Sequence, residues 1–559
     1  MSRIVAWMAV LAALTGTARA SAQARTEGYA IENATLVARC ARCHTLDADR
    51  RMTRISYLRK TPEGWQTSIR RMVALHGVRL EPDEAIAIVR YLADAQGLAP
   101  DELRPGLFEV ERRMIDYDYP GDSGVEYTCI RCHSMGRVIT QRRTKEEWAL
   151  LLATHRALYP LVDGQAFLAG DPDDEQPMDV AVDHLSEVYP LETPEWSAWS
   201  ATRRAPRLAG TWALTGHEPG KGALYGTVQV AADPRDPGAF TTTATYTYAE
   251  TGERVTRSGA AVVYTGYQWR GRSSPGTDAE LREVMLVERD QRTMSGRWFR
   301  GAYDELGPDV TLTRAGTEPL VAGAYPRALA RGQSVDVTLY GANLSALGGG
   351  SVDFGPGITV ERVSAAGDGS MTARLRVAQD AALGARDLVA TGSAQAVLAV
   401  REDAILVHDG VDRIVVTPAT GMARVGGGNF PKGYQVFEAM GFSDGPDGEP
   451  DTEDDLALGR VQATWRLEEY SATFGDDDLR YVGTMGADGT FTPSLDGPNP
   501  ERSGNRNNVG DVWVVATHRT ASGEEMSARA QLVVAVPLMM RWEPWRLTEG
   551  TLPATGDDR

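Results

Sequence analysis

The sequence predicts a multidomain protein in which a mostly helical N-terminal domain is followed by all-β domains. The chain has 559 residues, more than one ordinary hydrophobic core accommodates. Capped, amphipathic helical segments are concentrated before about residue 200. From about Arg207 onward, alternating runs separated by Gly, Asp and Pro turns indicate strands. The formal net charge of −18 argues against a nucleic-acid partner, whose phosphates would repel the chain.

Residues 1–24 are predicted to be an export leader. Arg3 supplies a positive start, residues 4–16 an apolar stretch, and residues 18–24 a run of small side chains that suits cleavage. The apolar stretch is shorter than the ~20 residues that a membrane-spanning helix needs, and no later run reaches that length. We therefore expect no membrane span and a mature protein outside the cytoplasm, in the periplasm.

All four cysteines belong to two C-x-x-C-H motifs, which are Cys40-Ala-Arg-Cys43-His44 and Cys129-Ile-Arg-Cys132-His133. This pattern predicts covalent attachment of haem c, because the two thiols add to the porphyrin vinyl groups and the adjacent histidine binds the iron. The sequence thus predicts two haems. Structural zinc is an alternative, but the cysteine pairs lie roughly 85 residues apart, beyond the usual spacing of zinc sites. Disulfides are a second alternative, and neither explains the histidine after each pair.

The segments after the two motifs resemble each other. Thr61 and Thr144 are predicted N-caps of amphipathic helices, and a tryptophan lies four residues after each of them. Each copy continues into a second helical stretch, at residues 81–96 and 178–188. An internal repeat of this kind predicts equivalent roles for equivalent positions.

The repeat predicts the distal ligands of the two irons. Met72 lies seven residues after Trp65, and His155 lies seven residues after Trp148. Seven residues is nearly two helical turns, so each pair shares one face. Methionine and histidine can both occupy the sixth position of a haem iron. We expect Met72 on the first haem and His155 on the second, with His76 as the competing ligand for the first.

The remaining chain divides into three predicted β units. Residues 201–317 carry alternating runs typical of an antiparallel barrel. Residues 318–403 and 404–559 carry short strands that fit two immunoglobulin-like sandwiches, and residues 25–200 form the helical haem domain. The expected barrel strands cover residues 210–214, 223–230, 240–248, 260–269, 281–288, 296–299 and 310–313.

One acidic loop raises the question of calcium. Residues 444–455 concentrate carboxylates between Gly and Pro residues, a setting that hard cations favour. Their spacing does not match an EF-hand, so a solvated acidic loop is the preferred interpretation. Because the haem motifs use every cysteine and no G-x-S-x-G or phosphate-binding motif occurs, any substrate chemistry is expected in another chain.

The order of these features resembles that of one known family. A leader, the CARCH and CIRCH motifs, the two Trp-containing helices, a barrel and two immunoglobulin-like domains are similar to the alpha subunit of quinohaemoprotein amine dehydrogenase. The resemblance implies haem attachment at Cys40, Cys43, Cys129 and Cys132, with His44 and His133 as proximal ligands.

The resemblance also implies partners and an activity. The expected partners are a β-propeller beta subunit and a small gamma subunit that carries cysteine tryptophylquinone. That cofactor would oxidise primary amines, and the alpha haems would pass the electrons to a small cytochrome c or a blue copper protein. Two other classes remain open from the sequence: a self-contained di-haem peroxidase, and a haem-bearing sensor or binding protein.

Overall fold

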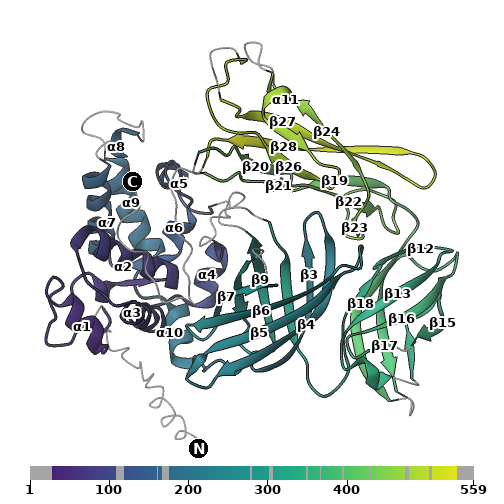
Figure 1. The fold of residues 1–559 in the computed structure, drawn as a ribbon, viewed down its shortest axis with the longest axis horizontal. Coiled ribbons are helices and arrows are strands. Elements are labelled where there is room, and N and C mark those ends of the chain that lie inside the picture. Colours follow the sequence, from purple (N-terminus) through teal and green to yellow (C-terminus); the bar gives the residue numbers. More distant parts are fainter. Residues whose placement is uncertain are drawn as a thin grey trace, which may run out of the picture.

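The computed structural model describes residues 28–537, except for short segments. These segments are 109–118, 160–161, 166–174, 277–279, 301–305, 348–349, 365–366, 393–395, 429, 472–476 and 503–506. The predicted leader, residues 1–24, lies outside the described residues. A helical N-terminal region, an eight-stranded barrel and two further β units follow one another along the chain (Figure 1). The predicted order of a helical region before all-β domains, including an antiparallel barrel, is confirmed.

The helical domain is built around two copies of one unit. Its helices are α1 (Ala34–Cys40), α2 (Pro62–His76), α3 (Pro82–Ala95), α4 (Pro100–Leu103), α5 (Ser123–Ile130), α6 (Gly136–Ile139), α7 (Lys145–Leu158), α8 (Val162–Gln165), α9 (Pro177–Val188) and α10 (Pro194–Thr202). The predicted N-caps are confirmed: the Thr61 hydroxyl accepts from the Gly64 amide, and the Thr144 hydroxyl from the Glu147 amide.

Each copy contains an equivalent hydrogen bond from a buried tryptophan. The Trp65 indole on α2 donates to the carbonyl of Gln96, the C-cap of α3, at 3.1 Å. The Trp148 indole on α7 donates to the carbonyl of Tyr189, the C-cap of α9, at 3.2 Å. Both rings are almost fully buried. Each tryptophan therefore fixes the angle between the helix that follows a C-x-x-C-H motif and the next helix of the same copy.

A two-stranded ladder joins the copies. Strand β1 (Leu58–Lys60) pairs antiparallel with β2 (Gln141–Arg143), and Arg59 lies directly opposite Arg142. Each strand leads straight into the N-cap of its helix, α2 or α7. The ladder thus places Arg59 opposite its counterpart in the other copy, Arg142.

The barrel closes in the order β10-β3-β4-β5-β6-β7-β8-β9. Its strands are β3 (Gly210–Glu218), β4 (Gly222–Asp233), β5 (Asp236–Tyr248), β6 (Arg254–Tyr264), β7 (Gln268–Ser274), β8 (Leu281–Val287), β9 (Thr293–Arg300) and β10 (Asp309–Arg314). The single strand expected over 260–269 is wrong, because the chain turns between β6 and β7. Thr265 and Gly266 both adopt positive φ there, and the Asp94 carboxylate holds the turn by accepting from the Thr265 amide at 2.6 Å.

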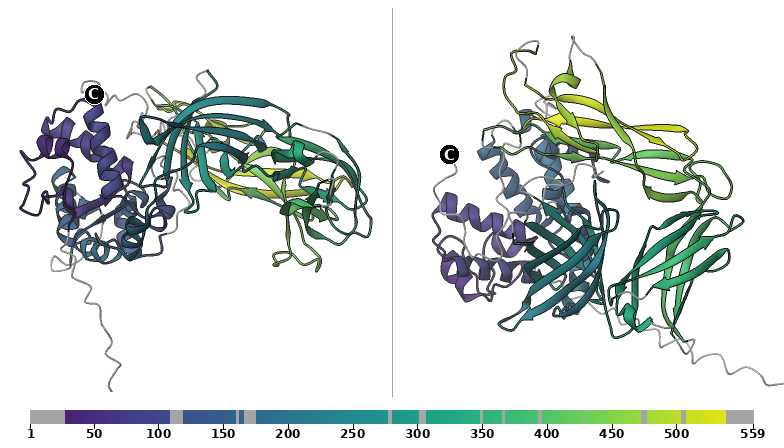
Figure 2. Two further views of the ribbon diagram at one scale, coloured as in Figure 1. Left: turned by 90° about the horizontal axis from the view of Figure 1, so that it is seen from below. Right: turned by 45° about the vertical axis from the view of Figure 1, so that its right-hand side comes forward.

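The barrel supports the helical domain from one side, as Figures 1 and 2 show. Leu98 and Leu103 of the helical domain pack into the same core cluster as the barrel residues Trp212 and Trp269. Arg270 of β7 contacts Glu63 of α2 at 2.7 Å. The helices that carry the predicted haem ligands are therefore held against a rigid β scaffold.

Two sheets around one core form the third unit. The orders are β11-β13-β16-β15 and β12-β18-β17-β14. The strands are β11 (Leu320–Tyr325), β12 (Ala328–Ala330), β13 (Ser334–Ala342), β14 (Ser351–Asp353), β15 (Ile358–Ser364), β16 (Ser370–Val377), β17 (Gly384–Thr391) and β18 (Val397–His408). The short β12 pairs in parallel with β18, the last strand of the unit.

The fourth unit repeats that parallel pairing between its second strand and its last, β20 and β28. Its strands are β19 (Arg413–Thr417), β20 (Thr420–Arg424), β21 (Gln435–Val436), β22 (Glu438–Ser443), β23 (Leu456–Arg460), β24 (Thr464–Glu469), β25 (Gly483–Met485), β26 (Thr490–Pro493), β27 (Gly510–Arg519) and β28 (Glu525–Ala535), with the short helix α11 (Asp478–Tyr481). His217 of the barrel contacts Glu438 of this unit at 2.6 Å.

An arginine lies among the carboxylates of the acidic loop 444–455. The Arg413 guanidinium pairs with Asp455 and lies 3.3 Å from Asp451 and 3.5 Å from Asp444. Asp444, Asp451 and Asp455 of this loop therefore lie close to the positive charge of Arg413.

Candidate functional site

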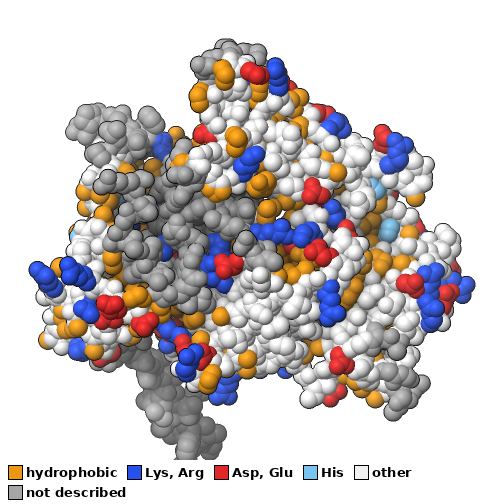
Figure 3. All heavy atoms as spheres, in the orientation of Figure 1, with side chains coloured by type: hydrophobic (Ala, Val, Ile, Leu, Met, Phe, Trp, Pro, Cys, Tyr) orange, Lys and Arg blue, Asp and Glu red, His pale blue; other side chains and the backbone are white. Residues whose placement is uncertain are grey.

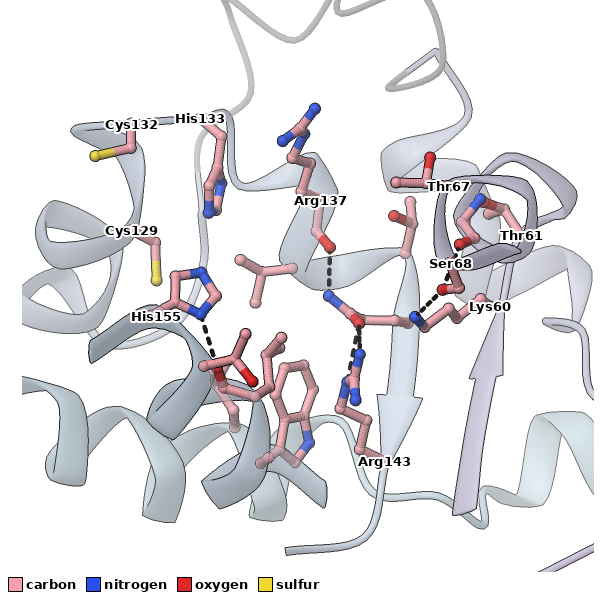
Figure 4. A pocket seen from close by; sticks show the side chains of 18 of the residues that line it. Lys60, Thr61, Thr67, Ser68, Cys129, Cys132, His133, Arg137, Arg143 and His155 are labelled. Atoms are coloured by element: carbon pink, nitrogen blue, oxygen red, sulfur yellow. Dashed lines mark hydrogen bonds between the residues drawn. The ribbon is translucent and has the colours of Figure 1, made fainter. Parts of the chain in front are cut away.

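A cavity of about 570 Å³ lies beside the second C-x-x-C-H motif. Cys129 on α5, Cys132 and His133 line one part of it, and His155 on α7 lines the wall across from His133 (Figure 4). Apolar side chains complete this part: Val138, Leu151, Leu152, Met178, Ala181 and Leu185. The structure thus brings together all four predicted site residues of the second motif.

The two histidine rings face each other across the cavity (Figure 4). Their centres are 6.5 Å apart. A metal ion held between two imidazoles needs ring centres about 6 Å apart, because metal–nitrogen bonds are about 2 Å long. The observed separation is compatible with one iron between His133 and His155.

Backbone carbonyls orient both rings. His133 Nδ1 donates to the Ser134 carbonyl at 2.9 Å, and His155 Nδ1 donates to the Leu151 carbonyl at 2.9 Å. Within the described chain, no hydrogen bond engages either Nε2. Burial lowers the pKa of His133, so this ring is neutral near neutral pH. A neutral imidazole with Nδ1–H held by a carbonyl presents the Nε2 lone pair that a metal requires.

The two thiols of the second motif lie together at this end of the cavity. Cys129 is half-buried, Cys132 is exposed, and the thiols are not joined in a disulfide. Burial raises the pKa of the Cys129 thiol to about 11, which keeps it neutral. In the described chain no three His, Cys, Asp or Glu side chains gather as a metal site. The donor set therefore fits haem attachment better than structural zinc.

The opposite end of the cavity is polar and basic. Lys60 of β1 and the hydroxyl side chains Thr67 and Ser68 of α2 lie there, across from the thiols (Figure 4). Arg143 also lies toward this end (Figure 4), and Arg71, another lining residue, is close enough for its charge to lower the pKa of Lys60. Sequence reasoning missed these residues. A basic residue directly precedes the N-cap threonine in each copy of the repeat, Lys60 in the first and Arg143 in the second. That shared position is the sequence signal that could have identified them.

The first motif shows part of the same arrangement. His44 Nδ1 donates to the Thr53 carbonyl at 2.9 Å, which leaves Nε2 for another partner. Cys40 ends α1 and is half-buried, whereas Cys43 is exposed. Burial and the neighbouring Cys43 raise the pKa of the Cys40 thiol. In both motifs the proximal histidine donates through Nδ1 to a backbone carbonyl, which is nine residues away for His44 and one residue away for His133.

The predicted distal residues of the first site both lie on α2. Met72 is half-buried and lies outside the core cluster that contains Trp65 and Ile69. His76 is the last residue of the helix and is exposed. The core of this copy instead contains Met52, which is fully buried. The assignment of Met72 as a ligand remains a prediction from the repeat.

The surface carries both signs of charge. Acidic and basic side chains are interspersed among the described residues on the face in Figure 3, although the chain as a whole has a net charge of −18. No described helix is long and apolar enough to cross a membrane.

Four family models match the chain in succession. They describe the quinohemoprotein amine dehydrogenase alpha subunit: its haem-binding domain at residues 30–196, domain II at 205–315, domain III at 318–401 and domain IV at 414–546. The matches follow one another through the helical region, the barrel and the two further β units.

The solved structures are less informative. A redesigned β-barrel shares 18% identity over 21% of this chain and 98% of its own, with a TM-score of 0.17. A mixed-linkage glucan utilisation protein, SGBP-B of Bacteroides ovatus, shares 12% over 58% of this chain and 60% of its own, with a TM-score of 0.20. These scores are too low to carry an argument. No curated protein matches the chain in sequence. From the four successive matches, the chain belongs to the quinohemoprotein amine dehydrogenase alpha subunit family, and its helical domain is a haem-binding domain.

Proposed function

We propose that this chain is the electron-transfer subunit of a periplasmic quinohaemoprotein amine dehydrogenase, an oxidoreductase acting on CH–NH₂ donors. It would pass electrons from a quinone in a partner subunit through two c-type haems to a soluble acceptor. The observation that carries this proposal is the pair His133 and His155, which face each other at 6.5 Å beside two thiols. Haem iron supplies reversible one-electron storage at such a site.

Eight residues would hold the two haems. Cys40 and Cys43 would form the thioethers of the first haem and Cys129 and Cys132 those of the second. His44 and His133 are the proposed proximal ligands, and Met72 and His155 the proposed distal ligands. Since a thioether raises a haem potential relative to a second imidazole, unequal ligation gives the two sites unequal potentials.

The family description names this chain as a subunit, which supports the presence of partner subunits. We propose a heterotrimer with a β-propeller beta subunit and a gamma subunit that carries cysteine tryptophylquinone, and a small cytochrome c or blue copper protein as acceptor. This chain has four cysteines, all in haem motifs, so the quinone belongs in another chain. We also propose cleavage of the leader and immunoglobulin-like folds for the last two units. Their parallel pairing of an early strand with the last strand supports this fold.

The experiment that tests the haem assignment is mass spectrometry after acid–acetone extraction, which removes non-covalent haem. The purified chain should keep two haems. Peptide mapping should place one on Cys40 and Cys43 and the other on Cys129 and Cys132. One haem, or none, would refute the proposal.

A further inference from the structure

The cavity beside the second motif has two chemically different ends. Cys129 and Cys132 lie with the facing histidines at one end, and Lys60, Thr67 and Ser68 lie at the other (Figure 4). Haem has the same asymmetry, because its vinyl groups and its two propionate carboxylates occupy opposite edges of the porphyrin. A haem attached through these thiols would direct its carboxylates toward the basic end.

The basic end has more positive charge than its carboxylates balance. Glu63 is engaged by Arg270 at 2.7 Å, and Glu147 by Arg54 at 2.8 Å. Lys60 donates to the neutral Ser68 hydroxyl at 2.8 Å. In the described part of the chain, neither Lys60 nor Arg71 forms an ion pair. Arg143 is buried and Lys60 is only partly exposed, and charged groups withdrawn from water are costly without a counter-charge. This end is therefore suited to an anionic ligand group, and the exposed Arg71 adds a further positive charge.

Arg143 adds to the excess of positive charge at the basic end of the cavity. Its guanidinium donates two hydrogen bonds to the neutral Gln141 side chain, and its nearest carboxylate is Glu147 at 3.8 Å. Burial, together with the charges of Arg54 and Arg71, lowers the pKa of Arg143 to about 9. Burial, Arg143 and Arg71 lower the pKa of Lys60 well below its usual range. Both pKa values fall because burial and neighbouring cations outweigh the opposing effect of Glu147.

We propose that Lys60 and Arg71, from the segment of the first motif, bind the propionate carboxylates of the second haem together with Arg143. This inference rests on the proposed attachment of haem at Cys129 and Cys132. Carboxylates from the ligand would satisfy the lysine and two guanidinium groups through charge-assisted hydrogen bonds. The first segment would then serve as part of the binding site for the haem of the second.

The test compares haem potentials in four variants of the full chain. Lys60→Met removes the charge and keeps much of the side-chain length, and Lys60→Arg retains the charge. Arg71→Gln is the second test variant, because Arg71 is exposed and its replacement leaves the fold intact. Arg79→Gln is the matched control, since Arg79 is exposed, lies in the loop after the same helix and does not line the cavity. Potentials are measured by spectroelectrochemical titration at several pH values.

Lys60→Met and Arg71→Gln should each lower the potential of the second haem and leave that of the first unchanged, because removing a cation near the second haem favours its more positive ferric state. The pH at which that potential changes should rise, since a propionate without its cation binds a proton more readily. Lys60→Arg and Arg79→Gln should match the unmodified chain. If both haems stay attached and neither test variant shifts a potential, the propionate proposal is overturned. Loss of haem from the unmodified chain would instead refute the proposed function.

Discussion

Arg59 and Arg142 lie opposite each other in the β1–β2 ladder, and both guanidinium groups contact the carboxylate of Glu102. Arg59 makes two hydrogen bonds to it, at 2.8 and 2.9 Å, and Arg142 lies 3.0 Å away. All three side chains are buried. One carboxylate thus contacts two arginines at the centre of the ladder that joins the two motif segments.

Replacing Glu102 should destabilise the helical domain. Glu102→Gln leaves two buried guanidinium groups without their counter-charge, and breaking a buried pair in this way costs about 3–5 kcal/mol. The thermal transition followed at the haem Soret band should move to lower temperature. Glu84→Gln is the control, because it removes an exposed ion pair with Arg39 and should remain near the unmodified chain. Equal transitions in both variants would contradict this role of Glu102.

The buried carboxylate of Glu102 predicts that the helical domain loses stability at low pH. Burial alone would raise the pKa of Glu102, but Arg59 and Arg142 outweigh it and lower this pKa below its ordinary value. A depressed carboxyl pKa stabilises the folded state above the unfolded pKa, about 4.3, and this stability is lost as the pH falls through the folded pKa. Urea unfolding of the helical domain should therefore become easier below about pH 4. In Glu102→Gln this acid dependence should be smaller.

Distal ligation can be read from the near-infrared spectrum. If Met72 binds the first iron and His155 the second, the oxidised protein shows a weak sulfur-to-iron band from one haem. Met72→Ala should abolish that band, and His155→Ala should leave it. The first haem should also have the higher potential. If the band survives Met72→Ala, or if the unmodified chain shows no band, His76 becomes the better candidate for the distal ligand of the first haem.

Amine chemistry should be absent from the isolated chain. The purified subunit should accept electrons from a chemical reductant at both haems, yet oxidise no primary amine, because its four cysteines belong to the haem motifs. Amine-dependent haem reduction should appear when the quinone-bearing subunit is added. Amine turnover by this chain alone would disprove the proposed division between subunits.

Much of the helical domain could be predicted from local sequence. The two motifs, the N-caps Thr61 and Thr144 and the repeated tryptophans are short-range patterns, and the structure has the helices where those patterns place them. The ring centres of His155 and His133 lie 6.5 Å apart, and the assignment of His155 as distal ligand stays a prediction. Such features depend on residues a few positions apart, which helix geometry relates directly.

Features that depend on distant residues could not be predicted in this way. The turn at Thr265 could not be predicted because a β-branched residue rarely adopts positive φ. Hydrogen bonds to the Asp94 carboxylate and the Ala93 carbonyl, both in the helical domain, hold it. Lys60 lines the cavity of the other motif because β1 pairs with β2. Arg413 pairs with three carboxylates of a loop that begins about thirty residues later in the chain. No local pattern contains these relationships.

The ladder between β1 and β2 also determines how the helical domain can be divided. Arg59 Nε donates to the Leu191 carbonyl at 2.6 Å, and its guanidinium contacts the Thr193 hydroxyl at 3.0 Å. A fragment that ended after α4 would contain the first motif. It would lack strand β2, which pairs with β1, and the Leu191 carbonyl, which accepts from Arg59. The two halves, although similar in sequence, therefore form one cooperative folding unit. During synthesis the first pair of thiols emerges well before the segment that closes the domain around it.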